Sequence, residues 1–244
     1  MLTEREKRRY ARQLMLFGDE GQERLKGAEV CIAGAGGLGS PVALYLAAAG
    51  VGTITLVDND EVELSNLNRQ VLHWDRDIGR RKVVSAEEKL SGMNPYIRIK
   101  AVHTTIDKGT VDTVVGEADL IVDAMDNFPV RFLLNDAAIR KGIPFIHGAI
   151  RGFHGQVITI LPGKTACLRC LFPQGAPGEV FPVVGVTPGI IAGIQANEAI
   201  KYLVVQGELL AGRLLLWDGH MSRVEEIAVE RNPKCPACAI KADR

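Results

Sequence analysis

The stretch that most constrains the fold is an apolar run, residues 30–40, that breaks into glycines and then resumes as a helix. Such a run predicts a buried parallel strand, a tight turn without side chains, and a helix that opens at Leu38 or Gly39. The free N–H groups at the start of this helix would point into the turn, an arrangement that binds phosphate. The spacing of Gly34, Gly36 and Gly39 is the fingerprint of dinucleotide-binding folds. Glycines alone indicate a phosphate-bearing ligand without saying which one, and the alternative is that they only allow strand and helix to pack closely.

The composition is that of an ordinary globular protein with a large core. The 244 residues are 47% hydrophobic and 24% charged, and 29 basic side chains balance 29 acidic ones. A chain without net charge has no global field that would attract nucleic acid or a membrane surface. No apolar run reaches the length of a membrane span, and residues 1–12 are charged. We therefore expect a cytoplasmic protein without a signal peptide and without a membrane or nucleic-acid partner.

Strands and helices alternate through the first 150 residues. A charged helix over residues 3–17 opens with Thr3 and has Glu6 three residues later, the signature of a capping box, and its basic side chains are typical of a solvated face. After the glycine turn, strands are expected at 53–57, 97–102 and 119–123, and helices at 40–50, 79–91, 107–115 and 128–141. This alternation predicts a Rossmann-like α/β fold with a mostly parallel central sheet.

The pattern changes beyond residue 143. A short strand at 144–147 and a strand at 155–161 are expected to lie antiparallel. A helix at 187–205 and strands near 213–217 and 223–229 follow. We therefore expect antiparallel C-terminal strands beside the parallel core.

Polar residues follow the second strand at the edge where ligands of open α/β sheets bind. Asp58 comes about 20 residues past the glycines, where dinucleotide folds place the acid that holds a ribose. A long polar connection over residues 58–70 comes next. Long ordered loops at the carboxyl end of a strand tend to be functional, so this loop is a candidate part of the site.

Basic side chains belong to the same region. Arg69 lies in the long loop, and Arg80, Arg81 and Lys82 open the following helix. One helix N-terminus supplies enough positive potential for a diphosphate, so Arg69 and Lys82 in addition indicate a third phosphate or a leaving pyrophosphate. The alternative, that the cluster only solvates a helix end, would hold for two of its three residues.

Two carboxylates follow the strand at 119–123. Asp123 and Asp126 lie three residues apart at the expected ligand-binding edge. A carboxylate beside a polyphosphate would hold Mg²⁺, which prefers one or two carboxylates together with phosphate oxygens and water. The alternative is that Asp126 caps the helix at 128–141, and the two roles can coexist.

Four of the five cysteines form two CxxC pairs, Cys167 with Cys170 and Cys235 with Cys238. Each two-residue spacer lets both thiolates grip one tetrahedral ion, so the pairs predict a Cys₄ zinc site. No ligand position is left open, which predicts a structural zinc that fastens the C-terminal tail to the segment after Leu161. A redox role is disfavoured because there are two copies and neither is expected to open a helix after a strand.

The order of these blocks resembles a known family. The segments at 34–39, 58–60, 65–70, 79–82 and 123–127, together with the two CxxC pairs, are similar to the bacterial adenylyltransferases of molybdopterin and thiamine biosynthesis, the ThiF/MoeB/HesA type, which are relatives of the ubiquitin-activating enzymes. The likeness runs from about residue 4 to residue 238, and residues 9–13 also look like the family's N-terminal signature. It implies a single adenylation domain over 1–244, with an N-terminal helix at 3–17, a nucleotide-binding core at 28–150, and antiparallel strands, a crossover loop and a zinc-bound tail at 151–244.

The resemblance implies an activity and its parts. ATP and Mg²⁺ would activate the C-terminal glycine carboxylate of a small ubiquitin-like sulfur carrier ending in Gly-Gly, and Arg12 would reach the active site of the partner subunit in a homodimer. The implied nucleotide contacts are Gly37, Asp58, Asp60, Ser65, Asn66, Leu67, Asn68, Arg69, Gln70, Lys82, Asp126 and Asn127. The implied catalytic residues are Arg12, Arg69, Lys82 and Asp126, with Asp126 also holding the magnesium ion.

The crossover loop departs from part of the family. Members that bind their carrier covalently have a cysteine there, whereas residues 175–182 contain none. Cys31, the fifth cysteine, lies in the first strand and is expected in the core. We therefore expect adenylation without a covalent cysteine intermediate, with sulfur delivered by another protein.

Three other interpretations stay open. An NAD-dependent oxidoreductase would use the glycine turn and Asp58, with His147 or His154 as catalytic candidates, but it would leave Arg69, Lys82 and Asp126 unexplained. A non-catalytic scaffold would keep the fold and the zinc site to dock a carrier protein. A related adenylating enzyme could act on a tRNA nucleoside or a peptide, which neutral overall charge disfavours only weakly.

Overall fold

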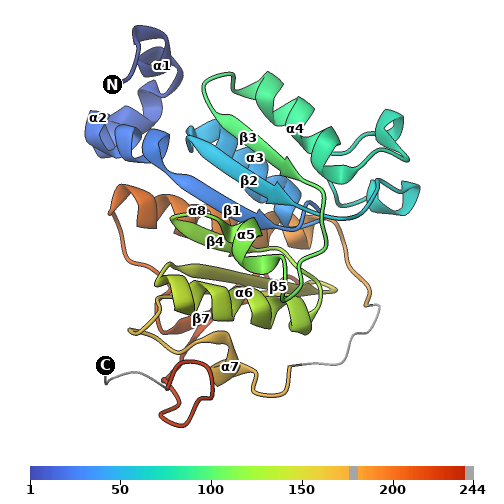
Figure 1. Ribbon diagram of the computed structural model, residues 1–244, viewed down its shortest axis with the longest axis vertical. Coiled ribbons are helices and arrows are strands. Elements are labelled where there is room, and N and C mark those ends of the chain that lie inside the picture. The colour runs from blue at the N-terminus through green and yellow to red at the C-terminus, as the bar shows by residue number, and fades with distance from the viewer. Residues whose placement is uncertain (176–180, 240–244) are drawn as a thin grey trace.

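One mixed sheet organises the chain, which the computed structural model describes at residues 1–175 and 181–239. Within these residues eight strands lie in the order β3-β2-β1-β4-β5-β6-β7-β8 (Figure 1). Strands β1 to β5 are parallel to one another, and β6, β7 and β8 are each antiparallel to the strand before them. The strands are β1 Glu29–Ala33, β2 Thr53–Val57, β3 Arg98–Val102, β4 Leu120–Asp123, β5 Phe145–Arg151, β6 His154–Ile160, β7 Arg213–Asp218 and β8 Arg223–Ala228. The expected fold class is confirmed.

Helices cover both faces of this sheet. One apolar core joins the sheet to α2, α3, α4 and α8, and a second joins it to α5, α6 and α7. Strand β1 shows the division, because Val30 and Ile32 belong to the first core and Cys31 and Ala33 to the second. No helix of the described residues is long and apolar enough to cross a membrane. The helices are α1 Glu4–Arg9, α2 Ala11–Gly27, α3 Gly39–Ala49, α4 Lys82–Met93, α5 Val111–Val115, α6 Phe128–Lys141, α7 Leu168–Leu171 and α8 Val186–Val204, with 3₁₀ turns η1 Leu64–Asn66 and η2 Asp75–Asp77.

The strand order places a ligand-binding crevice between β1 and β4. The chain runs outward from β1 to β2 and β3 on one side, and β4 and β5 lie on the other. Connections therefore leave β1 and β4 in opposite directions, and their carboxyl ends open a gap at this point. The glycine turn after β1 and the two aspartates at the end of β4 meet there.

The predicted N-terminal helix over residues 3–17 is wrong in its extent. Two helices meet at Tyr10, and the second continues to Gly27 across a break at Gly18, where φ is 66°. Tyr10 is buried, and its hydroxyl accepts a hydrogen bond of 2.8 Å from Nδ2 of Asn94. The hydrogen bond to Asn94 explains why the helix is interrupted at Tyr10, although local helix propensity predicts that it continues.

Two other boundaries differ for local reasons. Helix α5 begins at Val111 rather than at residue 107, because the Asp107 carboxylate accepts hydrogen bonds from the N–H groups of Gly109 and Thr110 and forms a turn. Strand β5 extends to Arg151, four residues beyond the expected end, because it pairs with β6 along its whole length. The expected spans of β2 and α6 are confirmed.

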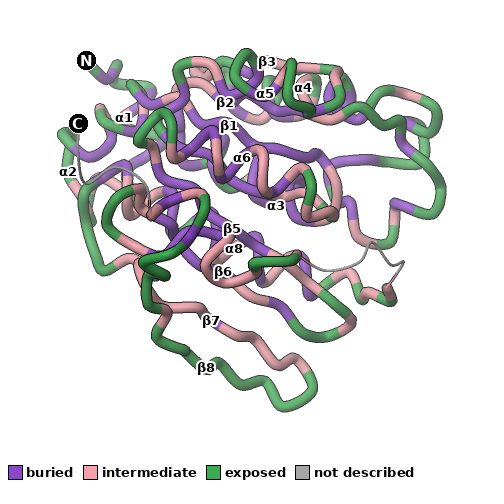
Figure 2. Tube along the Cα trace, turned by 60° about the horizontal axis from the view of Figure 1, so that its bottom comes forward, coloured by how far each residue is buried: buried purple, intermediate pink, exposed green. Residues whose placement is uncertain are grey.

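The β7–β8 hairpin is the least covered part of the sheet. Every residue of β8 is exposed, whereas β1, β2 and β4 are buried along almost their entire length (Figure 2). Met221, Val224 and Ile227 are among the exposed apolar side chains of this hairpin. The antiparallel end of the sheet is therefore open to solvent beside the ligand-binding edge.

The N-terminal helices are held by a buried carboxylate. Glu6 and Thr3 form the predicted capping box, with N–H to oxygen distances of 2.8 and 3.2 Å. Glu6 also pairs with Nζ of Lys26 on α2 at 2.8 Å. Burial opposes its ionisation, but the hydrogen bonds from Lys26 and Thr3 prevail and lower the pKa of Glu6 to about 2.

We expect Glu6→Gln to lower the free energy of unfolding by about 2 kcal/mol at pH 7. The folded pKa lies below the unfolded one, so the stabilisation is complete above the ordinary pKa of 4.5 and is lost as the pH falls toward 2. Urea denaturation from pH 7 to pH 3 should show the difference between wild type and variant shrinking. Glu20→Gln, at a side chain that is 82% exposed, is the control and should change stability by less than about 0.5 kcal/mol. A difference that stays constant over this range would contradict the assignment.

Candidate active site

A cavity of about 450 Å³ lies at the carboxyl edge of the parallel strands. Its walls come from the ends of β1, β2, β3, β4 and β5, from the loop at 58–70 and from the start of α4. The predicted site residues that line it are Gly37, Asp58, Asp60, Arg69, Gln70, Lys82, Asp126 and Asn127. The structure thus brings together residues that are up to 90 positions apart in the sequence, and their individual roles stay predictions.

Close backbone contact shapes the glycine turn at one end of the cavity. Gly34 has φ of 106°, and a Cβ atom there would lie 2.6 Å from the carbonyl oxygen of Ala124. A Cβ atom at Gly39 would lie 1.8 Å from the carbonyl oxygen of Gly34. Helix α3 begins at Gly39, as expected, so the N–H groups of its first turn are close to the cavity. Only glycine fits at these two positions, because either side chain would collide with backbone.

Asp58 belongs to both the turn and the cavity. Its Oδ2 accepts a hydrogen bond of 2.8 Å from the N–H of Ala35, and its Oδ1 accepts one of 2.8 Å from the N–H of Asp60. The carboxylate therefore holds the glycine turn against the start of the polar loop. The ribose role that the sequence predicts for Asp58 is compatible with this position at the cavity wall.

Arg69 is a cation without a carboxylate partner among the described residues. Its Nη1 donates to the carbonyl oxygen of Ser65 at 2.8 Å and to Oδ1 of Asn68 at 3.0 Å, both uncharged. Asn66 is buried, and its Oδ1 accepts from the N–H of Glu63 at 3.2 Å, which closes turn η1. Of the predicted nucleotide contacts, Ser65, Asn66, Leu67 and Asn68 do not line the cavity in this chain. They shape the loop that presents Arg69.

Lys82 is the one member of the predicted basic cluster that reaches the cavity. Its side chain is only 6% exposed, and Nζ lies 2.7 Å from Oδ2 of Asp60. Arg80 instead pairs with Asp77 and Glu88, and Arg81 is exposed. The solvating role that the sequence allowed for two of the three residues therefore fits Arg80 and Arg81.

The two aspartates after β4 have different environments. Asp123 is fully buried, where its Oδ2 lies 2.7 Å from Nδ1 of His147 and 3.4 Å from Nε of Arg131. Asp126 lines the cavity instead. The alternative that Asp126 caps α6 is wrong, because Asn127 is the N-cap and its Oδ1 accepts from the N–H of Val130 at 3.1 Å. The carboxylate of Asp126 is therefore available to a ligand.

Sequence reasoning missed His73, which supports the glycine turn from behind. Its Nε2 lies 3.0 Å from the carbonyl oxygen of Ala35, which can only accept, so Nε2 carries the proton. Its Nδ1 therefore accepts from the hydroxyl of Ser85 at 3.0 Å, and the oxygen of that hydroxyl accepts from Nζ of Lys89 at 2.7 Å. Burial lowers the pKa of His73, so the ring is neutral at pH 7. A lone histidine after a loop gave no sequence signal for this contact.

Gln70 lines the cavity and has a buried amide oxygen without a hydrogen-bond partner among the described residues. The residue is only 4% exposed. Its Nε2 lies beneath the glycine turn, because a Cβ atom added at Gly36 would be 3.5 Å from it. The Gln70 amide thus keeps unused hydrogen-bonding capacity next to the glycine turn.

A second cavity, of about 720 Å³, adjoins the first. It lies between the start of α6 and the strands β5 to β8, and aromatic side chains such as Phe128, Phe172 and Trp217 form part of its wall. The residues that line both cavities are Asp126, Asn127, Arg131, Ile150 and Phe181. The arrangement therefore offers a polar cavity and a more apolar one that share a wall.

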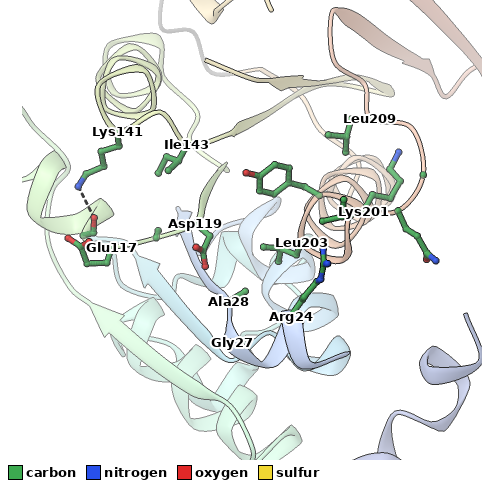
Figure 3. A pocket seen from close by; sticks show the side chains of 16 residues that line it. Arg24, Gly27, Ala28, Glu117, Asp119, Lys141, Ile143, Lys201, Leu203 and Leu209 are labelled. Carbon is green, nitrogen blue, oxygen red and sulfur yellow. Dashed lines mark hydrogen bonds between the residues drawn. The ribbon is translucent and has the colours of Figure 1, made fainter. Parts of the chain in front are cut away.

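A third cavity, of about 870 Å³, lies at the opposite edge of the sheet (Figure 3). It faces the amino ends of β1, β4 and β5, with Lys141 and Glu117 on one side and Arg24 and Lys201 on the other. Its cations already have partners. Lys141 donates to the carbonyl oxygen of Gly116, Lys201 donates to that of Glu208, and Arg24 pairs with Glu20. Because none of the predicted site residues lines it, we do not assign the site there.

The four paired cysteines cluster at the short helix α7, which contacts α6. Their sulfur atoms all lie within 4.8 Å of one another, and Cys167, Cys235 and Cys238 are buried. This group could hold a metal ion. The expectation that neither CxxC pair opens a helix after a strand is wrong, because Cys167 is the N-cap of the short helix α7, which follows β6. The other argument, that the motif occurs in two copies, agrees with the observed cluster, in which the two pairs come together.

The remaining sequence candidates lie outside the first cavity. Arg12 is exposed on α2 and does not line it. His147 is fully buried against Asp123, and His154 lines the second cavity. Cys31 is buried in β1, as expected.

This chain is similar in sequence and in fold to known proteins. The family model described as "ThiF family" matches residues 10–237. The chain is 46% identical over 238 residues to the SAMP-activating enzyme E1 of Haloferax volcanii, covering 94% of this chain and 88% of that protein. It is 44% identical over 249 residues to the sulfur carrier protein adenylyltransferase of Thermus thermophilus, covering 97% and 92%. The microcin C7 biosynthetic enzyme MccB, solved with N-formylated MccA, has a TM-score of 0.86 at 26% identity over 94% of this chain and 74% of that one.

We expect His73→Phe to weaken ATP binding by about 5- to 30-fold, because the carbonyl of Ala35 loses a donor worth about 1–2 kcal/mol while the ring volume is kept. Isothermal titration calorimetry with ATP measures this. His73→Gln, whose amide can donate to the same carbonyl, should recover part of the affinity, and a change at the exposed His103 should have no effect. Unchanged ATP affinity in a folded His73→Phe protein would show that the contact does not position the turn.

Proposed function

The chain belongs to the ThiF family and is an adenylyltransferase, and we propose that it uses ATP to adenylate the C-terminal glycine carboxylate of a small ubiquitin-like sulfur carrier, releasing pyrophosphate. The observation that carries the proposal is the single cavity that holds the glycine turn, Asp58, two cations and Asp126. Its volume of about 450 Å³ is within the range of small-ligand sites.

The cavity wall suggests how ATP would lie. The N–H groups around Gly37 would receive phosphate oxygens, and Asp58 would accept from ribose hydroxyls. Ile106, which follows β3, and Met125, which follows β4, would supply an apolar surface for the base. Arg69 and Lys82 would contact the outer phosphates.

The chemistry needs charge neutralisation more than proton transfer. The acceptor carboxylate is already ionised at pH 7, so one of its oxygens can attack the α-phosphorus directly. A carboxylate–phosphorus bond forms, the bond from that phosphorus to the bridging oxygen breaks, and pyrophosphate leaves with the electron pair. The protein must bring two anions together and stabilise the departing charge. Arg69, which has no carboxylate partner among the described residues, suits the second task.

Magnesium fits the same wall. Asp126 lines the cavity beside the expected phosphates and does not cap a helix, so its carboxylate would hold Mg²⁺. When bound, the ion would neutralise part of the charge of the leaving pyrophosphate.

The second cavity would receive the tail of the carrier. It adjoins the nucleotide cavity at Asp126 and opens beside the exposed β7–β8 hairpin, where a globular partner could rest. The sequence identity of 44% to a sulfur carrier protein adenylyltransferase supports this acceptor class. The second candidate is another acceptor, a peptide or a tRNA nucleoside. The MccB structure solved with MccA has the lower identity of 26%, so the carrier remains the first choice.

We propose that this chain forms no covalent bond to its carrier. All five cysteines are accounted for, four in one cluster and Cys31 buried in β1, where burial raises the pKa of its thiol to about 12. The loop at 175–182 has no cysteine in its sequence, although residues 176–180 lie outside the described part of the chain. Sulfur would then come from a separate donor protein.

The proposal includes a homodimer. Arg12 does not line the cavity of its own chain, and the neighbouring Met15 and Leu16 on α2 are 80% and 73% exposed. Such exposed apolar residues are typical of an interface. In the dimer, Arg12 would reach the nucleotide cavity of the partner subunit.

The cysteine cluster would hold structural zinc. A tetrahedral zinc–thiolate site with bonds of about 2.3 Å places sulfur atoms about 3.8 Å apart. The observed separations are 3.9 Å for Cys167 and Cys170, 3.6 Å for Cys167 and Cys235, and 3.4 Å for Cys170 and Cys238. A bound ion would crosslink α7 to a C-terminal segment 68 residues away.

The decisive experiment is ATP–pyrophosphate exchange with each small Gly-Gly-ended protein of the same cell. Wild type should catalyse exchange with at least one of them. Asp126→Ala should lower the rate at least about 100-fold without changing the circular dichroism spectrum, because the charge at the phosphates is no longer organised. Asp112→Ala, at an exposed carboxylate on α5, is the control. Exchange that persists in Asp126→Ala would remove Asp126 from the magnesium site.

We expect about one zinc ion per chain by plasma mass spectrometry. Cys235→Ser should lose this zinc and at least about 2 kcal/mol of stability, which lowers the melting temperature by about 4–8 °C for a chain of this size. Cys31→Ala serves as the comparison, since it removes a buried thiol from the sheet and should keep the metal. Full zinc content in Cys235→Ser would contradict the assignment.

A further inference from the structure

Arg131 occupies the wall between the two cavities. It lies in the first turns of α6, is 7% exposed, and lines both the nucleotide cavity and the second cavity. Among the residues shared by both cavities in the described chain, it is the only cation. Arg69 and Lys82 line the nucleotide cavity alone.

Its guanidinium is held in place with donors to spare. Nη2 donates to the carbonyl oxygen of Met125 at 2.6 Å and to that of Gly148 at 3.4 Å. Nε lies 3.4 Å from Oδ2 of Asp123 but makes no hydrogen bond. Nη1 has no hydrogen-bond partner among the described residues. A guanidinium has five N–H donors in a rigid plane. In Arg131 the N–H groups of Nε and Nη1 therefore remain unused, although the side chain is more than nine-tenths buried.

The neighbouring carboxylate of Asp123 lies away from Nη1 in its contacts. Asp123 lies on the Nε side, and its Oδ2 is shared with Nδ1 of His147. Burial lowers the pKa of His147, and the contact with Asp123 only partly offsets this, so the ring is neutral at pH 7. The carboxylate of Asp123 is thus engaged at Nε and at the ring, which leaves Nη1 to a ligand.

The passage between the cavities needs such a donor. An acceptor carboxylate that moves from the second cavity toward the nucleotide must pass Asp126, which lines the same wall and carries the same charge. Two like charges about 4 Å apart in a partly buried site repel by several kcal/mol unless a cation or a directed donor lies between them. Arg131 is the group at that wall that can supply one.

We propose that Arg131 binds the terminal carboxylate of the acceptor through Nη1 and so selects acceptors that end in a free carboxylate. The inference rests on the proposed function and adds a residue to it. One carboxylate oxygen accepts from Nη1, and the other is left to attack the α-phosphorus. The planar edge favours a carboxylate over a neutral amide, because the donor–acceptor contact is strengthened by charge.

The test compares two forms of one acceptor. The probe is the small Gly-Gly-ended protein that supports exchange, prepared with its natural carboxylate and with a C-terminal amide. Binding of both to the ATP-loaded enzyme is measured by calorimetry. Wild type should bind the carboxylate form at least about 10-fold more tightly than the amide form, and Arg131→Gln should lose this preference while still binding the amide form.

Two further variants keep the result interpretable. Arg140→Gln, on the same helix but 52% exposed and paired with Asp112, should retain the full preference. Arg131→Lys keeps the charge without the planar edge and should retain a reduced preference; it also serves if Arg131→Gln does not fold. Equal weakening of both acceptor forms would reduce Arg131 to a structural residue and overturn the inference. Absence of exchange by wild type with every carrier would instead overturn the proposed function.

Discussion

The close approach of two backbone segments, the turn after β1 and the loop after β4, is the constraint on which the site depends. Gly34 and Gly39 allow this contact, because a side chain at either position would collide with a carbonyl oxygen. The carboxylate of Asp58 fixes the N–H of Ala35 from one side, and the ring of His73 fixes its carbonyl from the other. The same contact sets how far Asp126 lies from the turn, since Ala124 touches the turn and Asp126 follows two residues later. The contact between the turn after β1 and the loop after β4 therefore both stabilises the fold and positions the residues of the site.

Charge is distributed over the site in a way that suits the transfer of a nucleotide. Lys82 is matched by Asp60, and the deeply buried Arg131 by Asp123, so neither is an isolated buried charge. Arg69 is the exception among the cations of the described chain that line this cavity, because its guanidinium contacts only uncharged oxygens. A polyanion entering the cavity would complete the pairing that the protein alone leaves unfinished. This is the electrostatic complement expected of an adenylyltransferase that handles a triphosphate.

In the proposed function, the antiparallel half of the sheet would extend the site toward a macromolecular acceptor. Strands β6 to β8 provide one wall of the second cavity, and the exposed hairpin continues beyond it. The cysteine cluster brings α7 and the C-terminal segment together beside α6. Asn127 and Arg131 belong to the start of α6. The segments that differ most from a simple nucleotide-binding domain are therefore those that would position the acceptor beside the nucleotide.

By itself, the sequence determined the glycine turn, the spans of β2 and α6, the mixed sheet and the pairing of the four cysteines. These signals are local, because glycine spacing, apolar periodicity and CxxC motifs depend on a few neighbouring residues. Only the tertiary structure decided that Asp123 is buried while Asp126 faces the cavity, that Asn127 rather than Asp126 caps α6, and that His73 and Arg131 support the site. The N-terminal helix was also misjudged, because the anchor of Tyr10 is Asn94, 84 positions away. The physical reason is the same in each case: burial and hydrogen bonding are set by residues that come together only when the sheet is assembled.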